Sequence, residues 1–166
     1  MKKGGTPITK RAVIYYSLDG NTKEAAQKIA EALGAALIEL ETEKPMPSGK
    51  ASRILYGGML STMNHTPALK PLSADPANFD EIILGTPVWA WKIAAPVRSF
   101  LTKYAVDEKV TAVFTLSGGA DDTKCLEDLR HLLHHIRHTA TLADRKSSFA
   151  EGNAVRLKKF IAALTE

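Results

Sequence analysis

The sequence contains very little cysteine. Cys125 is the single cysteine among 166 residues, so the chain cannot form an intramolecular disulfide. This excludes a small secreted scaffold that depends on disulfides for its stability. Apolar residues recur at helical spacing around Cys125. We therefore expect this side chain to be buried as a small apolar group and not to act as a reactive thiol.

Long hydrophobic runs are missing, and so is the pattern of a secretory signal peptide. We therefore expect a cytoplasmic protein that does not enter a membrane. Hydrophobic residues still make up 45% of the chain, which is enough for the core of one globular domain. We place this domain at residues 11–166, after a flexible tail at residues 1–10 that contains Gly4, Gly5 and Pro7.

The body of the chain has no excess of charge of one sign. The net charge is +4, but Lys2, Lys3, Lys10 and Arg11 together account for that excess and lie at the N-terminal end. Basic and acidic residues balance in the rest of the sequence. We therefore predict no nucleic-acid partner for the folded domain.

Apolar strands alternate with amphipathic helices along the chain. The pattern predicts strands at 11–16, 35–40, 81–85, 110–116 and 139–144, and helices at 21–33, 51–63, 96–104, 123–138 and 153–165. Such apolar strands need helices on both faces, which is typical of a parallel sheet. We predict a three-layer, doubly wound α/β fold with a five-stranded parallel sheet in the order 2-1-3-4-5.

Ligands of such a sheet bind beyond the carboxyl ends of the strands, where the strand order reverses. Three predicted loops reach this edge, at residues 17–22, 85–92 and 115–122. The first loop offers the hydroxyls of Ser17 and Thr22 and a glycine at position 20, and a helix follows it directly. The free N–H groups and the dipole of that helix favour an anion such as phosphate. The glycine patterns of a P-loop and of a dinucleotide-binding turn are both absent.

The other two loops offer a surface for a planar ligand. Trp89 and Trp91 lie in the second loop, and an exposed aromatic ring there provides a surface for stacking. We predict that Trp89 stacks on the ligand. Gly118 and Gly119 follow a buried strand in the third loop, so their N–H groups can approach a ligand closely.

The pattern Ser-x-x-Gly-Asn-Thr at 17–22 resembles the phosphate-binding loop of the flavodoxins. The segment Gly85-Thr-Pro-Val-Trp89 resembles the loop that contacts their isoalloxazine ring. The resemblance extends from about residue 11 to residue 166 and implies a flavodoxin-like fold with FMN as cofactor. It implies that the flavin carries the chemistry, with neither a catalytic side chain nor a metal. The residues that it implies for FMN binding are Ser17, Leu18, Asp19, Gly20, Asn21, Thr22, Thr86, Pro87, Val88, Trp89, Ala90, Trp91, Leu116, Ser117, Gly118 and Gly119.

Two features depart from the flavodoxin pattern. Asp19 lies where the family usually has a hydroxyl side chain, and a carboxylate repels a phosphate dianion. Either Asp19 points outward or the bound anion is not a phosphate. The third loop also lacks the tyrosine that often covers the flavin ring in this family, which leaves room for a substrate or a second cofactor.

The sequence thus predicts an FMN-binding redox protein that transfers electrons to a partner protein or reduces a small acceptor. An alternative is an NAD(P)H-dependent quinone or FMN reductase, which the near-neutral body favours, because carrier flavodoxins tend to be acidic. A further alternative is a flavin-less module that binds a partner protein through the same fold. We expect a monomer or a homodimer, and the electron donor and acceptor stay open.

Four histidines near the C-terminal end of the predicted helix 123–138 have the spacing of metal ligands. His131 pairs with His135, and His134 pairs with His138, at four-residue intervals. The glutamate of a metalloprotease motif is absent between them. We interpret them as part of a solvated helix face.

Overall fold

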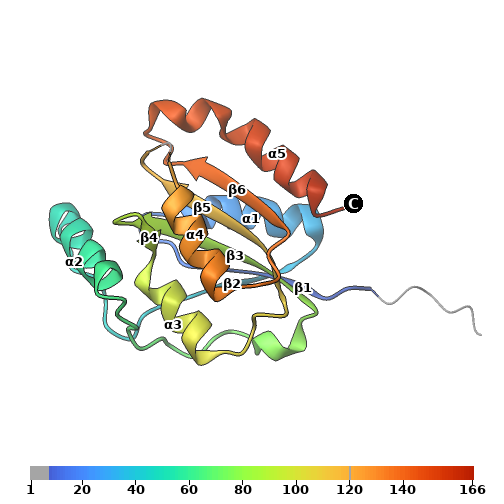
Figure 1. Cartoon of the computed structure of the whole chain (residues 1–166), viewed down its shortest axis with the longest axis horizontal. Coiled ribbons are helices and arrows are strands. Elements are labelled where there is room, and N and C mark those ends of the chain that lie inside the picture. The colour runs from blue at the N-terminus through green and yellow to red at the C-terminus, as the bar shows by residue number, and fades with distance from the viewer. Residues whose placement is uncertain (1–7, 120) are drawn as a thin grey trace, which may run out of the picture.

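The computed structural model describes residues 8–119 and 121–166, and Figure 1 shows their arrangement. Most of the predicted tail, residues 1–7, lies outside the described residues. The parallel strands are β1 (Arg11–Tyr15), β2 (Ala36–Glu39), β3 (Glu81–Trp89), β5 (Val110–Ser117) and β6 (His138–Ala143). They lie in the order β2-β1-β3-β5-β6. The predicted α/β class and the predicted strand order are confirmed.

The helices form two layers, one on each face of the sheet (Figure 1). Helices α1 (Asn21–Leu33) and α5 (Asn153–Ala163) cover one face, while α3 (Ala95–Lys103) and α4 (Thr123–Leu132) cover the other. Helix α2 (Lys50–Thr62) stands at the margin and packs against the end of β3. Two short 3-10 helices, η1 (Pro76–Asn78) and η2 (Ser148–Gly152), lie in connections. None of the helices in the described part of the chain combines the length and the apolar composition needed to cross a bilayer.

Two hydrophobic clusters attach these layers to the sheet. Successive strand residues point to opposite faces, so Val13 and Tyr15 of β1 face α1 and α5. Ala12 and Ile14 face the opposite layer of α3 and α4. Burial of both sheet faces explains why the strands are almost wholly apolar in sequence.

Strand β3 is longer than predicted, and the prediction that residues 85–92 form a loop was wrong. The strand continues to Trp89, and β4 (Lys92–Ile93) pairs back on it in the antiparallel direction. Ala90 and Trp91 form the turn with φ of 49° and 62°, which is the left-handed region that a two-residue hairpin turn uses. A proline such as Pro87 is disfavoured inside a strand, and Ala-Trp is not a typical hairpin turn, so this hairpin could not be predicted from the sequence.

Helix α4 ends at Leu132 and not at His138 as predicted. Asp107 accepts a hydrogen bond from the backbone N–H of His134 at 2.7 Å, and its carboxylate lies 2.8 Å from Nδ1 of the same residue. These contacts hold the chain away from a helical path, and His138 already begins β6. The four histidines therefore do not share one helix face, so that interpretation was wrong.

Cys125 has no exposed surface and lies between α4 and the sheet. Burial raises the pKa of the Cys125 thiol to about 12, and the nearby charge of Asp122 acts in the same direction. The neutral thiol is thus the form at physiological pH, which confirms the expectation of an apolar structural role.

Candidate functional site

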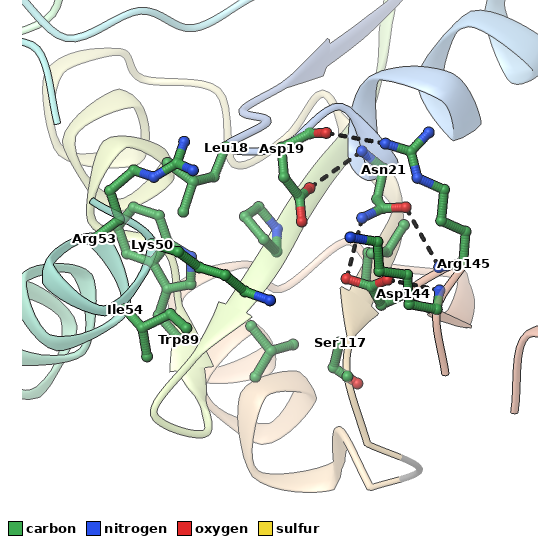
Figure 2. A pocket seen from close by; sticks show the side chains of 15 residues that line it. Leu18, Asp19, Asn21, Lys50, Arg53, Ile54, Trp89, Ser117, Asp144 and Arg145 are labelled. Carbon is green, nitrogen blue, oxygen red and sulfur yellow. Dashed lines mark hydrogen bonds between the residues drawn. The ribbon is translucent and has the colours of Figure 1, made fainter. Parts of the chain in front are cut away.

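A cavity of about 370 Å³ opens at the carboxyl edge of the sheet (Figure 2). This volume lies within the range of small-molecule sites, which is roughly 300–1,000 Å³. The structure brings all three predicted loops to the wall of this cavity. The predicted site residues that line it are Leu18, Asp19, Asn21, Pro87, Val88, Trp89, Leu116, Ser117 and Gly118.

The loop before α1 is held in shape by its own side chains. Oγ of Ser17 accepts hydrogen bonds from the backbone N–H groups of Gly20 at 3.1 Å and Lys23 at 3.2 Å. Gly20 has a φ of 93°, which a glycine adopts without the strain that a side chain would cause. The Ser17 hydroxyl can still donate its own hydrogen to an anion.

Asp19 lines the cavity and does not point away from it. Its Oδ1 accepts a hydrogen bond from the backbone N–H of Asn21 at 3.2 Å, as Figure 2 shows. This N–H group is one that an anion at the start of α1 would use. A bound phosphate must therefore either displace the Asp19 carboxylate or bind beside it.

A fourth loop, which the sequence analysis missed, completes this end of the cavity. Asp144, Arg145 and Lys146 follow β6 and line the cavity wall. Nδ2 of Asn21 donates to Asp144 Oδ2 at 3.1 Å, and Arg145 Nη2 donates to the backbone oxygen of Asp19 at 3.4 Å. Arg145 is thus held next to the start of α1, and Lys146 follows it on the cavity wall. The available signal was their position after the last predicted strand, because no glycine lies in this loop between Asp144 and Ser148.

Helix α2 also reaches the cavity, which the sequence did not indicate. Lys50, Arg53 and Ile54 from its first two turns line the wall. Figure 2 shows Lys50 extending across the cavity, and Arg53 and Trp89 on the side away from Arg145. Four basic side chains and two acidic ones line the whole cavity, so its charge favours an anionic ligand.

Trp89 lines the cavity, but much of its ring is packed against protein. The ring meets Tyr16 edge to face, with 5.5 Å between the ring centroids. On α2, a Cβ built at Gly57 would lie 3.1 Å from Cε3 of Trp89, so the helix backbone touches the ring. Trp91, by contrast, is 68% exposed at the tip of the hairpin and does not line the cavity. Only the part of the Trp89 ring that faces the cavity can stack on a ligand, and this stacking stays a prediction.

The other predicted site residues have structural positions around the cavity. Thr86 is fully buried, where its Oγ1 accepts the N–H of Ala94 at 3.1 Å and donates to the Pro87 oxygen at 2.8 Å. Thr22 is also buried, in the first turn of α1. The predicted residues that do not line the cavity are Ser17, Gly20, Thr22, Thr86, Ala90, Trp91 and Gly119.

The apolar wall lies beside the cationic end of the cavity and completes the arrangement. Pro87, Val88 and Trp89 of β3 face the cavity, together with Leu116 of β5. A ligand that fits both parts carries an anionic group and a planar apolar body. Residues 10–147 match the model of the protein family described as flavodoxin. The chain belongs to the flavodoxin family.

Solved structures share this flavodoxin fold at low sequence identity. One is a protein from Bacteroides uniformis ATCC 8492 that is described as a flavoprotein by inference. It has a TM-score of 0.72 and 24% sequence identity, and the match covers 93% of this chain and 98% of that one. A flavoprotein from Lactobacillus acidophilus NCFM, solved in complex with FMN, has a TM-score of 0.67 and 19% identity, over 92% and 98%. A WrbA-like flavodoxin from Agrobacterium tumefaciens has a TM-score of 0.59 and 18% identity, over 95% and 98%. At these identities the likeness shows the fold alone.

Proposed function

We propose that this flavodoxin-family protein binds FMN in the cavity and uses it to transfer electrons to a partner protein or to reduce a small acceptor. The observation that carries the proposal is the continuity of an anion-binding helix start with an apolar, partly aromatic wall. Membership of the flavodoxin family supports it. The relative from Lactobacillus acidophilus was solved with FMN, which supports the same cofactor here.

The residues present fit the two ends of FMN. The Asn21 amide, the start of α1 and the cations Arg145 and Lys146 suit a phosphate dianion that displaces the Asp19 carboxylate or binds beside it. Pro87, Val88, Trp89 and Leu116 suit the flavin ring and exclude water from it. When bound, FMN supplies the capacity to take up and release one or two electrons. The protein holds, orients and partly desolvates the cofactor.

Reduction of a small acceptor with NAD(P)H as donor is the second candidate function. The third loop places Leu116, Ser117 and Gly118 on the cavity wall, and no aromatic side chain from this loop lines it. One side of the cavity therefore stays open for a second molecule. Adding NADH or NADPH to the FMN-loaded protein without oxygen tests this function. Rapid loss of the visible flavin absorbance supports a reductase, whereas a spectrum unchanged over minutes supports a carrier that depends on a protein donor.

The assignment of FMN as the cofactor is tested with substitutions that remove positive charge beside the proposed phosphate position. The R145Q/K146Q variant should bind FMN about tenfold or more weakly, because losing even one charge-assisted hydrogen bond to the phosphate costs roughly 1.5–3 kcal/mol. Its affinity for riboflavin, which has no phosphate, should stay unchanged. The matched control is R130Q, since Arg130 is exposed on α4 and does not line the cavity. Equal loss of FMN and riboflavin affinity would contradict the placement of the phosphate beside Arg145.

A further inference from the structure

Lys50 and Arg53 share one face of α2 with Gly57. Their spacing of three and seven residues places the three residues on one side of the helix. Gly57 is buried and lies against the Trp89 ring, which fixes that side of the helix toward the sheet. Lys50 and Arg53 are therefore directed into the cavity, and both line it (Figure 2).

The charges of this pair lack protein partners within residues 8–119 and 121–166. None of the salt bridges formed there involves Lys50 or Arg53. Nε of Arg53 is also buried and has no hydrogen-bond partner in that part of the chain. A buried N–H donor without an acceptor is unfavourable, so the protein leaves the Arg53 guanidinium incompletely paired.

This pair lies apart from the cations proposed for the FMN phosphate. Figure 2 shows Arg145 near Asn21 on one side of the cavity and Arg53 near Trp89 on the other. Arg145 contacts the loop before α1, where its Nη2 donates to the Asp19 oxygen at 3.4 Å. FMN carries a single phosphate, so the second pair of cations is free for another anionic group.

We propose that Lys50 and Arg53 form a subsite for an anionic group, a carboxylate, sulfonate or phosphate, on the molecule that exchanges electrons with the flavin. This proposal rests on the proposed function. The guanidinium of Arg53 offers a planar pair of donors, and the ammonium of Lys50 adds a mobile point charge. Ile54 lines the same side of the cavity and provides apolar contact for this ligand. Binding at this subsite itself moves no electrons.

The test uses the oxidised, FMN-loaded protein and two matched anthraquinones. Anthraquinone-2-sulfonate carries the anionic group, and 2-(hydroxymethyl)anthraquinone is its neutral counterpart. Binding is followed by calorimetry and by the change in the visible flavin spectrum. We expect the sulfonate to bind about tenfold more tightly than the neutral compound, which corresponds to about 1.4 kcal/mol. The K50A/R53A variant should lose this preference, with little change in affinity for the neutral compound.

Two control variants accompany this test. K158A removes an exposed lysine on α5, which does not line the cavity, and should keep the preference for the sulfonate. K50R/R53K retains both charges and should keep most of the preference. A comparison of NADP⁺ with NAD⁺ then identifies the source of the anion. If the unchanged protein prefers NADP⁺ and K50A/R53A does not, the subsite binds the phosphate of an electron donor. If K50A/R53A loses only the preference for the sulfonate, the subsite binds an anionic electron acceptor.

The result that overturns the subsite is distinct from the failure of FMN binding. Absence of FMN binding by the unchanged protein refutes the proposed function before any quinone is added. Normal FMN binding with equal affinities for the two anthraquinones overturns the subsite. A preference for the sulfonate that survives in K50A/R53A overturns it as well. If K50A/R53A instead weakens FMN and leaves riboflavin unchanged, the pair holds the cofactor phosphate and the subsite is wrong.

Discussion

Two adjacent glycines in α2 provide a matched test of how this helix packs against the candidate site. A Cβ added at Gly57 would lie 3.1 Å from Cε3 and 3.2 Å from Cδ2 of Trp89. A Cβ added at Gly58 would meet Cβ of Ala90 at 3.9 Å, an ordinary van der Waals distance. The substitutions G57A and G58A thus make the same chemical change in one helix, but one of them crowds the Trp89 ring.

The two substitutions should have different effects on the free energy of unfolding. Alanine is favoured over glycine in a helix interior by about 1 kcal/mol, and this gain applies at both positions. G57A also overpacks its surroundings, which typically costs about 1–3 kcal/mol. The Trp89 ring cannot retreat freely, because Tyr16 meets it edge to face with 5.5 Å between the centroids. We expect G58A to stabilise the protein by about 1 kcal/mol and G57A to be about 1–3 kcal/mol less stable than G58A.

Equilibrium unfolding in urea measures this difference directly, with Trp fluorescence and circular dichroism as independent signals. Because Trp89 lines the cavity, G57A should also change FMN affinity or the visible spectrum of the bound flavin. G58A should leave both as they are in the unchanged protein. If G57A stabilises the protein as much as G58A, Trp89 is not held against α2, and the account of this side of the cavity is wrong.

Two further predictions concern titratable groups away from the cavity. Burial opposes ionisation of Glu81, yet hydrogen bonds from Thr111 and Arg11 hold the pKa of this carboxyl below its ordinary value. The ionised Glu81 side chain should therefore stabilise the fold fully at neutral pH, and this stabilisation should be lost as the pH falls through the lowered pKa. In urea unfolding at pH 7, E81Q should be less stable than the unchanged protein by about 1–3 kcal/mol. This difference in the free energy of unfolding should become smaller at acid pH, and a difference that does not change with pH would refute the prediction. Cys125 should resist an aromatic disulfide reagent at pH 8 in the native protein, because the thiol is buried and burial raises its pKa to about 12. In urea the exposed thiol should react fully. Rapid labelling of the native protein would show that α4 opens readily.

The parts of the fold that depend on local pattern could be predicted from the sequence. Helix α1 begins and ends where predicted, because its buried alanines and Ile29 recur at helical spacing. Gly34 then ends the helix with a φ of 60°. The parallel sheet followed from strands that are apolar on both faces, and its order followed from the alternation of strands and helices.

The parts that depend on contacts distant in sequence could not be predicted. Helix α4 ends early because Asp107, from the connection before β5, holds His134 through its backbone and its ring. The basic residues of the cavity come from α2 and from the loop after β6. Nothing near Lys50 or Arg145 in sequence indicates a ligand. Their positions follow from how α2 packs against the end of β3 and how the loop after β6 contacts the loop before α1.

A comparison of FMN with riboflavin on the purified protein is the sharpest test of whether the cavity holds a flavin by its phosphate. The two ligands share the flavin ring and differ in the phosphate, so their affinities separate the contribution of α1, Arg145 and Lys146 from that of the apolar wall. We expect FMN to bind and riboflavin to bind at least about tenfold more weakly, a difference of about 1.4 kcal/mol. Equal affinity would show that the cavity does not hold the phosphate. Absence of binding by either flavin would contradict the cofactor proposal as a whole and would favour a module that binds a partner protein through the flavodoxin fold.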